Sequence, residues 1–179
     1  MSQWKILPGV DLYYVTTTII NWQQVFTDLP YFEVILDSLK FCIANKELHL
    51  HAYVIMPNHA PYILSTDKDK RFPDIMRDFN THTSREITKL LEVDSKLQLL
   101  EVFADAARRD GRGNKYKVWQ EGYHPITLGT PDFTAQKLNY LHNNPVRKGY
   151  VERPEQWRYS SARNYLLGDE SLIKVELLF

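Results

Sequence analysis

The stretch from Leu48 to Ser65 places the strongest constraint on what this chain can fold into. It contains two apolar runs, Leu48–Met56 and His59–Ser65, separated only by Pro57-Asn58. Two such runs on either side of a two-residue turn predict a β-hairpin. A polar Asn-His pair at the point where two buried strands meet needs an explanation, and a functional role is one candidate.

A two-residue turn also fixes which side chains of the hairpin share a face. The expected pairs on one face are Met56 with His59, Val54 with Pro61, and Ala52 with Ile63. The other face then carries His49, His51 and Tyr53, beside Ala60, Tyr62 and Leu64. His59 would have no second histidine beside it, and a lone histidine on a strand is more often a hydrogen-bonded structural residue than a ligand. Because proline lacks an N–H, Pro61 suits only an edge strand or a bulge.

Outside the hairpin, segments with the periodicity of a strand alternate with segments that have the periodicity of a helix. Apolar spacing and turn residues predict a strand at Val10–Ile20, helices at Tyr31–Asn45, Phe72–Leu91, Ser95–Arg109 and Thr130–Asn144, and helical structure around Ser160–Leu167. Lys115–Trp119 is a candidate strand that Gly122–Leu128 extends or follows, and Leu172–Phe179 either forms a strand or packs down. The order β-α-β-β-α-β is that of a ferredoxin-like antiparallel sheet, so we expect a single α+β domain.

Length and composition narrow the class of protein. The 179 residues suffice for one domain with a core. No apolar run approaches the ~20 residues of a membrane span, and Met1–Gly9 lacks the pattern of a secretory signal. The single cysteine, Cys42, excludes an internal disulfide and fits a reducing cytoplasm, where we expect the protein to be located. We expect one domain over residues 1–179, with a core at about 10–146 and a basic, aromatic extension at about 147–179.

The charge of the chain is balanced in total but unevenly distributed. There are 22 basic and 22 acidic residues, yet Arg108–Arg163 holds 11 of the basic residues and only 5 of the acidic ones. Basic residues interleaved with tryptophan and tyrosine suit the neutralisation of phosphates and the stacking of bases. A chance imbalance on a solvated surface explains the composition equally well.

Tyr140 and Asn144 are four residues apart, which places them on one face of the predicted helix. A tyrosine hydroxyl can act as a nucleophile, and an asparagine amide oxygen can bind Mg²⁺ or Mn²⁺. By spacing alone, a half-buried tyrosine and a helix-ending Asn-Pro pair are the more common explanation.

Four segments together resemble a known family. They are Met56–His59, Val118–His124, Tyr140–Tyr150 and Pro154–Arg163. In this order they resemble the REP-associated tyrosine transposases, which are related to small insertion-sequence transposases of the HUH single-tyrosine class. The resemblance extends from about Tyr14 to Tyr165 and includes Thr16-Thr-Thr and Trp22-Gln-Gln-Val-Phe.

The resemblance implies a ferredoxin-like fold with extra helices, including a C-terminal helix that bears the tyrosine. The implied activity is cleavage and rejoining of single-stranded, palindromic or hairpin DNA through a 5′-phosphotyrosine link. Tyr140 would be the nucleophile, and His59 and Asn144 would bind a divalent metal, Mg²⁺ or Mn²⁺. The protein would act as a monomer or homodimer, associated with the nucleoid when bound to DNA. The candidate DNA-binding residues are Arg112, Lys115, Lys117, Trp119, Arg147, Lys148, Trp157, Arg158 and Arg163.

The chain departs from the family at its defining motif. The family pattern is His-hydrophobic-His, whereas this chain has His59-Ala60-Pro61. Since proline has no ligand atom, we expect metal affinity to fall by ~10–100-fold or more. Two hypotheses therefore stand: a transposase that nicks DNA through Tyr140, or a catalytically impaired relative that recognises a DNA sequence or hairpin. A purely structural or protein-binding domain would explain neither the basic half nor the Tyr140–Lys148 segment.

Overall fold

The computed structural model describes residues 11–67, 72–122 and 124–179. The strands are β1 (Tyr13–Thr18), β2 (Leu48–Tyr53), β3 (His59–Thr66) and β4 (Ile126–Thr127). The helices are α1 (Leu29–Asn45), α2 (Phe72–Val93), α3 (Leu97–Asp110), α4 (Pro131–His142), α5 (Asn144–Arg147) and α6 (Ala162–Leu167), with 3₁₀ turns η1 (Ile20–Trp22) and η2 (Pro154–Gln156). The predicted start of the first strand at Val10 lies outside the described residues.

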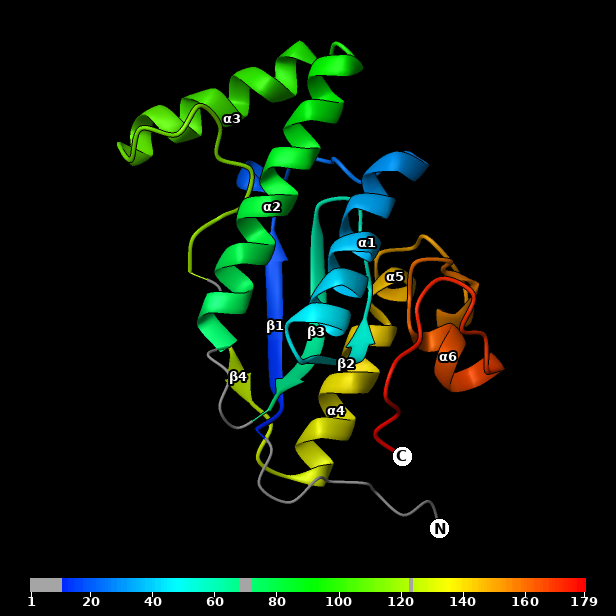
Figure 1. Ribbon diagram of the computed structural model, residues 1–179. Coiled ribbons are helices and arrows are strands. Elements are labelled where there is room, and N and C mark those ends of the chain that lie inside the picture. Colours follow the sequence, from blue (N-terminus) through cyan, green and yellow to red (C-terminus); the bar gives the residue numbers. More distant parts are fainter. Residues whose placement is uncertain (1–10, 68–71, 123) are drawn as a thin grey trace.

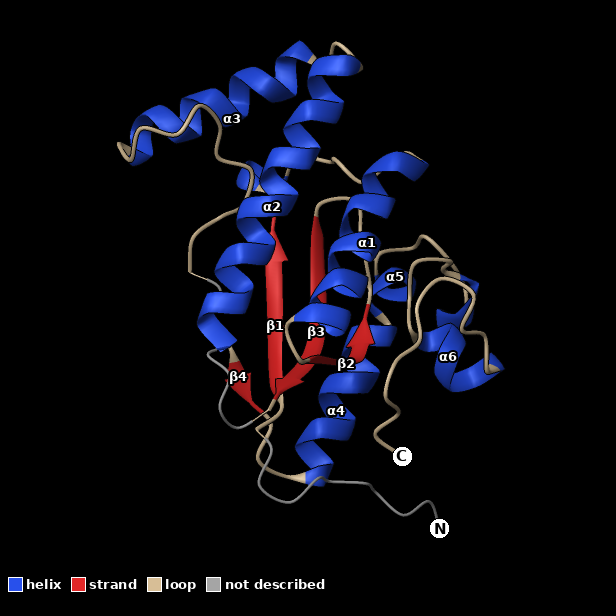
Figure 2. Ribbon diagram, viewed as in Figure 1, coloured by secondary structure: helices blue, strands red, loops and turns tan. Residues whose placement is uncertain are grey.

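The strands form one antiparallel sheet in the order β2-β3-β1-β4. Together with α1 and α2 this is the β-α-β-β-α-β arrangement, so the predicted ferredoxin-like α+β fold is confirmed. α3 is an addition that points away from the sheet at an angle to α2 (Figures 1 and 2). None of the helices within the described ranges has the length and apolarity to cross a membrane.

The sheet buries both of its faces, each in a separate apolar cluster. One face, with Val15, Tyr62 and Leu64, packs on α1 and α2 in a cluster that also includes Leu100 and Phe103 of α3. The other face, with Tyr14 and Ile63, packs on Leu138 and Leu141 of α4. Neighbouring residues of β1 and β3 thus alternate between the two clusters, as the twofold period of a strand requires.

α4 begins as predicted but ends earlier. Thr130 caps it, because its Oγ1 accepts a hydrogen bond from the Phe133 N–H at 3.3 Å. The helix stops at His142, and Asn144 opens the separate helix α5. Asn143 between them has a ψ of 1°, and Pro145 has no N–H to continue the helical ladder. The predicted single helix through Asn144 is therefore wrong.

The register of the hairpin holds near its turn and changes farther away. Met56 pairs with His59 and Ala52 with Ile63, as expected. A β-bulge then lies between Leu50 and Ala52, and it shifts the preceding residues by one position. Leu48 and Leu50 consequently pack in the same cluster as Tyr53 and Tyr62. The predicted placement of His49 and His51 on the Tyr53 face is wrong for this reason.

Pro61 lies in β3, an interior strand, so the expectation of an edge strand or a bulge at this residue is also wrong. Its carbonyl accepts from the Val54 N–H at 3.1 Å, but proline cannot return a hydrogen bond. The segment Tyr159–Ser161 supports the hairpin from the other side. The Ile55 N–H donates to Tyr159 O and the Ser161 N–H donates to Tyr53 O, both at 2.9 Å.

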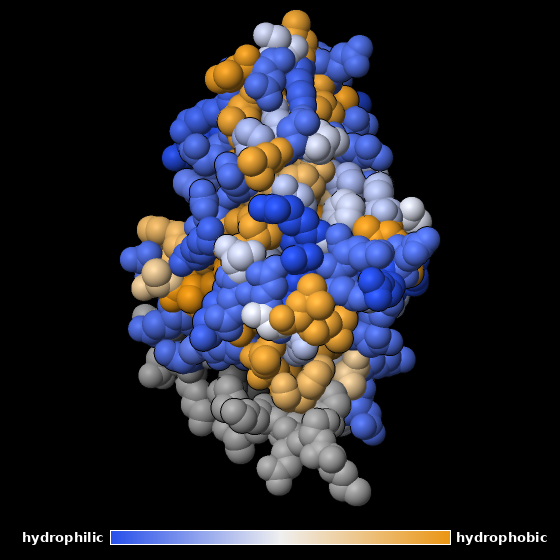
Figure 3. Space-filling model, turned by 90° about the vertical axis from the view of Figure 1, so that its right-hand side faces the viewer, coloured by the Kyte–Doolittle hydropathy of each residue, from blue (hydrophilic) through white to orange (hydrophobic). Residues whose placement is uncertain are grey.

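Two further segments extend the sheet without forming named strands. The predicted strand Lys115–Trp119 is reduced to a single bridge between Ile19 and Trp119, which lies beside the end of β1. The C-terminal tail packs down along β2, where the Glu176 N–H donates to Leu50 O at 2.9 Å. The side of the molecule that includes the C-terminal segments is largely hydrophilic, with separate apolar areas (Figure 3).

Candidate functional site

His59 begins β3 directly after the hairpin turn and is 8% exposed. Its Nδ1–H donates to Asn58 Oδ1 at 2.7 Å, and its Nε2 accepts from Asn144 Nδ2 at 2.9 Å. A hydrogen bond that holds one ring nitrogen fixes the tautomer and leaves the lone pair on the other. The lone pair of His59 is therefore directed at Asn144.

The environment of His59 keeps its imidazole neutral. Burial, with a smaller contribution from the positive charge of Lys148, lowers its pKa to about 4. A neutral imidazole is the form that binds metal ions. The nearby Lys148 is exposed and makes no ion pair among the described residues, so a positive charge lies next to the imidazole.

The residues around His59 fit a weak divalent-metal site. Asn144 is 6% exposed at the start of α5, and its amide carries an oxygen as well as the nitrogen that faces His59. Within the described ranges, no group of three or more His, Cys, Asp or Glu side chains is placed to hold a metal. One imidazole nitrogen and one amide oxygen suffice only for an ion such as Mg²⁺ that retains several waters.

Residue 61 lies on the same strand face as His59 and carries no side-chain donor atom. Residues two apart on a strand share a face, so Pro61 lies on the same side of β3 as His59. It is buried and pairs with Thr16 of β1. His51 does not supply a second imidazole, because its Nδ1 bonds Glu176 O at 3.0 Å and its Nε2 bonds Ser65 Oγ at 2.8 Å.

Tyr140 is 52% exposed on α4, and cations surround its ring. The Arg147 guanidinium lies 3.8 Å from the ring centroid, and Arg147 Nη1 donates to Tyr140 O at 2.8 Å. Lys137 Nζ is 5.8 Å from the same centroid. Stacked cations of this kind stabilise the position of an aromatic ring.

The Tyr140 ring lies near Tyr14 of β1. Lys137 Nζ is 5.2 Å from the centroid of the Tyr14 ring and 5.8 Å from that of the Tyr140 ring, so the two rings share one cation. On β1, Tyr14 is four residues from Thr18, the partner of His59, which corresponds to about 13 Å at roughly 3.3 Å per residue. No hydrogen bond or ring contact among the described residues joins Tyr140 to His59 or Asn144. Tyr140 lies on α4 and Asn144 begins α5, so the prediction that both belong to one helix is wrong.

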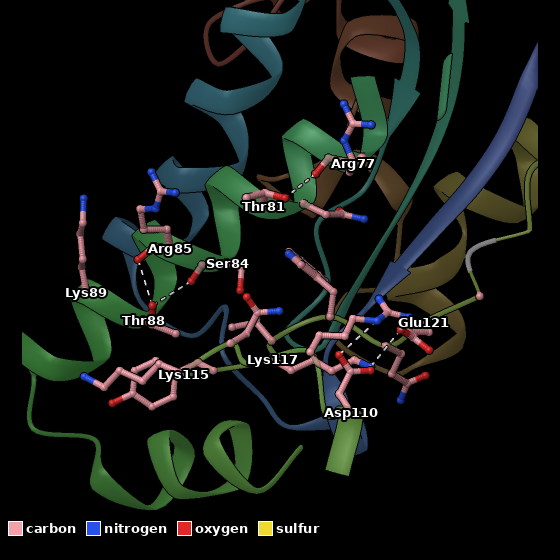
Figure 4. Close-up of a pocket in the computed structure, with 18 of the residues that line it drawn as sticks. Arg77, Thr81, Ser84, Arg85, Thr88, Lys89, Asp110, Lys115, Lys117 and Glu121 are labelled. Atoms are coloured by element: carbon pink, nitrogen blue, oxygen red, sulfur yellow. Dashed lines mark hydrogen bonds and ion pairs between the residues drawn. The ribbon is translucent and has the colours of Figure 1, made fainter. Parts of the chain in front are cut away.

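Trp119 lines a groove of about 850 Å³ between α2 and residues 110–122, together with three of the predicted DNA-binding cations. Each of these cations is paired with an acid: Lys115 with Glu92 at 2.8 Å, Lys117 with Asp110 at 2.7 Å, and Arg112 with Glu121 at 2.5 Å. Figure 4 shows Lys117 beside Asp110 and Glu121. The cationic side chains Arg77, Arg85 and Lys89 of α2 line the opposite wall.

The two predicted stacking tryptophans are held by hydrogen bonds. Trp119 is 7% exposed, and its Nε1 donates to Thr83 Oγ1 at 3.0 Å. Trp157 is half-buried, and its Nε1 donates to Ile55 O at 3.0 Å. Both rings connect parts of the fold, and Trp119 presents little surface to a base.

The other predicted DNA-binding cations differ in their availability. Arg163 is half-buried, with Nη2 bound to Asp169 at 2.7 Å and Nη1 donating to Glu155 O at 3.0 Å. Arg158 is exposed and has no carboxylate partner among the described residues. Together with Arg147 and Lys148, Arg158 offers its charge to a ligand more directly than Arg163 does.

Two polar residues support the site: Asn58, whose pairing with His59 was noted in the sequence without a stated role, and Ser161, which was not identified. Asn58 orients His59, and its position immediately before that histidine was an available signal. Ser161 connects β2, the hairpin partner of β3, to the end of α4, because its Oγ binds both the Tyr53 N–H at 2.9 Å and His142 Nε2 at 2.8 Å. Ser161 is more than a hundred residues from Tyr53 in the chain, so no local pattern reveals this role.

Comparison with known proteins adds information about the fold. The chain is similar to a solved structure described as a REP-associated tyrosine transposase bound to a REP hairpin, with a TM-score of 0.59 and 18% identity, over 100% of this chain and 94% of that one. A candidate transposase from Deinococcus radiodurans has a TM-score of 0.46 and 18% identity, over 80% of this chain and 97% of that one. No family model and no curated protein matches the sequence. At this identity, the first similarity establishes a shared fold.

Proposed function

We propose that this chain, which has the fold of a REP-associated tyrosine transposase, binds single-stranded or hairpin DNA and cleaves and rejoins it through Tyr140. The observation that carries the proposal is the 2.9 Å contact between His59 and Asn144. These two residues are 85 positions apart and belong to two separate motifs that resemble the transposase family. Because the chain shares the fold of such a transposase, the resemblance of both motifs to the family agrees with the structure.

In the proposed reaction, Tyr140 Oη attacks the phosphorus of a phosphodiester. The Oη–P bond forms as the P–O3′ bond breaks, and the proton of the phenol passes, directly or through water, to the departing 3′ oxygen. The products are a 5′-phosphotyrosine and a free 3′ hydroxyl. Attack by a 3′ hydroxyl on the phosphotyrosine reverses the bond changes, so rejoining needs no external energy source.

His59 Nε2 and the Asn144 amide oxygen would hold a divalent cation, Mg²⁺ or Mn²⁺, after rotation of the amide. Such a cation would stabilise the developing negative charge on the scissile phosphate. The chain itself supplies the remaining elements. Asn58 fixes the orientation of the His59 ring, and Lys148 adds a positive charge beside it.

The exposed cations Arg147, Lys148 and Arg158 are the proposed first contacts of the DNA phosphates. Arg112, Lys115 and Lys117 would contribute only if a phosphate displaced their carboxylate partners. Tyr140 would also have to swing from the Tyr14 side toward His59 for cleavage. The Arg147 guanidinium, 3.8 Å from the ring centroid, would have to release the ring in that step.

A second candidate function is DNA binding without efficient cleavage. The presence of Pro61 at the position of a second histidine favours it. In this case the fold would recognise a sequence or hairpin through its basic and aromatic surface. The two candidates share a DNA-binding surface and differ in whether a covalent intermediate forms.

The test is incubation of the protein with hairpin DNA that carries single-stranded flanks, in Mg²⁺ or Mn²⁺, followed by denaturing electrophoresis. A covalent adduct that is absent in Tyr140→Phe supports the enzyme. DNA binding without an adduct supports the second candidate. Absence of both binding and adduct at low salt contradicts both candidates.

Pro61→His tests whether the missing ligand limits the reaction. Because residue 61 shares the face of His59, the new imidazole should increase Mn²⁺ affinity by about 10–100-fold, measured by electron paramagnetic resonance. Pro61→Leu is the matched control, since it restores the backbone N–H without adding a side-chain ligand atom. An equal gain in both variants would show that the backbone, and not the ligand, was responsible.

A further inference from the structure

The turn η1, which follows β1, holds two consecutive residues in an unusual backbone conformation. Asn21 has a φ of 52° and Trp22 a φ of 56°, in the left-handed region that non-glycine residues rarely adopt. Such conformations persist only where the surroundings enforce them, and they are frequent at functional sites. Here the enforced conformation presents the side chain of Trp22.

One of the two hydrogen bonds that hold Trp22 comes from the hairpin that carries His59. The Trp22 N–H donates to Ile19 O at 2.9 Å, and Asn58 Nδ2 donates to Trp22 O at 3.3 Å. The opposite end of the same amide, Asn58 Oδ1, accepts from His59 Nδ1. One asparagine side chain therefore holds both the candidate ligand and the turn that bears Trp22.

The indole ring lies beside His59 but is not part of either core cluster. The centroids of the two rings are 5.7 Å apart, with an interplanar angle of 68°. Trp22 is 57% exposed, and burial of so large a side chain would ordinarily be favourable. The backbone thus fixes a large aromatic surface in solvent, next to the proposed metal ligand.

We propose that Trp22 is the stacking platform for an unpaired nucleobase adjacent to the phosphate at His59 and Asn144. This inference rests on the proposed function and names the part of the substrate that the site recognises. Every base has a flat face that can stack on indole, so the platform would select unpaired over paired DNA with little sequence preference. The edge-to-face contact with His59 leaves ring surface available for this stack.

The geometry also explains why Trp22, and neither Trp119 nor Trp157, has this role. Trp119 is enclosed between α2 and β1, and Trp157 is engaged by Ile55. Of the tryptophans in the described ranges, Trp22 has the most exposed ring. It is also the one in ring contact with His59.

The experiment measures binding of fluorescently labelled hairpin DNA with single-stranded flanks, in the Tyr140→Phe background and with chelator present, so that no cleavage occurs. Trp22→Ala should weaken binding by about tenfold, and Trp22→Phe by less, since a smaller ring still stacks. Phe41→Ala is the matched control, because Phe41 is also 57% exposed but lies on α1. Thermal unfolding of each variant checks that the fold is retained.

A scan with single abasic nucleotides identifies the base that stacks. The loss caused by Trp22→Ala should disappear when one particular flanking nucleotide is abasic and should persist at the others. Binding of unlabelled single strand should also quench tryptophan fluorescence in the natural chain and much less in Trp22→Phe. Two results would overturn the stacking role alone. One is equal DNA affinity of the natural chain and Trp22→Ala. The other is a loss of affinity from Trp22→Ala that stays the same whichever nucleotide is abasic. Failure of the natural chain to bind any DNA would overturn the proposed function with it.

Discussion

The groove beside α2 and the surface of α5 are both basic, but their charges are used differently. In the groove, Lys115, Lys117 and Arg112 each contact a carboxylate of the same region. On α5, Arg147 binds a backbone carbonyl and an aromatic ring, and Lys148 has no carboxylate partner among the described residues. The number of basic residues is therefore a poor guide to where DNA binds. The relevant quantity is the charge that remains after internal pairing.

The largest expected effect distinguishes these surfaces directly. The double variant Arg147→Gln/Lys148→Gln should weaken binding to single-stranded DNA by about tenfold or more at low salt and lower the salt dependence by roughly 0.7 per lost phosphate contact. Arg112→Gln/Lys115→Gln, the matched pair from the groove, should change affinity less than about twofold, because those charges are already compensated. Fluorescence anisotropy across a salt series measures both quantities. A larger loss from the groove pair would reverse the comparison.

Removal of the groove carboxylates should reduce the difference between the groove and the α5 surface in their contribution to DNA affinity. Glu92→Gln/Glu121→Gln removes the partner of Lys115 and the nearer partner of Arg112, which keeps only Asp110 at 3.6 Å, so both cations become more available to phosphate. We expect DNA affinity to rise by about threefold and the salt dependence to steepen. Glu33→Gln/Glu47→Gln removes the same charge elsewhere and controls for net charge. A gain of the same size in the control would mean that the groove has no specific role.

A smaller effect concerns stability. The pair of Lys117 and Asp110 is mostly buried, with side-chain exposures of 19% and 10%. Asp110→Asn should lower the unfolding temperature by a few degrees, because it leaves Lys117 with the weaker contact to Glu121 at 3.3 Å. Lys148→Gln should leave it unchanged. Calorimetry of the two variants checks whether the groove charges stabilise the fold while those of α5 do not.

The smallest expected effect is on the stability that the exposed ion pairs of His49 contribute. A hydrogen bond to Glu176, with a further one to Asp67, raises the pKa of His49. Since the folded pKa exceeds the unfolded one, the added stability is fully present below about pH 6.5 and is lost as pH rises through the folded pKa. The difference in unfolding free energy between the natural chain and His49→Gln should be under about 1 kcal/mol at pH 5.5 and should vanish at high pH. A difference that grows with pH would contradict this assignment.

Local patterns predicted the fold well because its main elements depend on neighbouring residues. The turn at Pro57-Asn58 set the pairing of Met56 with His59, and Thr130 marked the start of α4. The errors arose where distant segments intervene. The bulge at His51 is stabilised by Ser65, Glu176 and Tyr165, and Glu176 is 125 residues away.

The candidate site was also predictable in part. The family resemblance brought His59 and Asn144 together, and the structure places them in direct contact. The orientation of Tyr140 was not predictable, since it depends on Arg147 and Lys137 stacking around the ring. The pairing of Arg112 with Glu121 was equally hidden, because it depends on the path of the loop between them.

The C-terminal segments have a consequence for the outer edge of β2. Tyr159–Ser161 bonds to residues 53–55, and Glu176 bonds to Leu50, so polypeptide that is not itself a strand occupies much of this edge. An open strand edge is a template for pairing with another chain and for aggregation. The covered edge resists sheet-to-sheet joining between copies of the protein, and any self-association would have to use another surface.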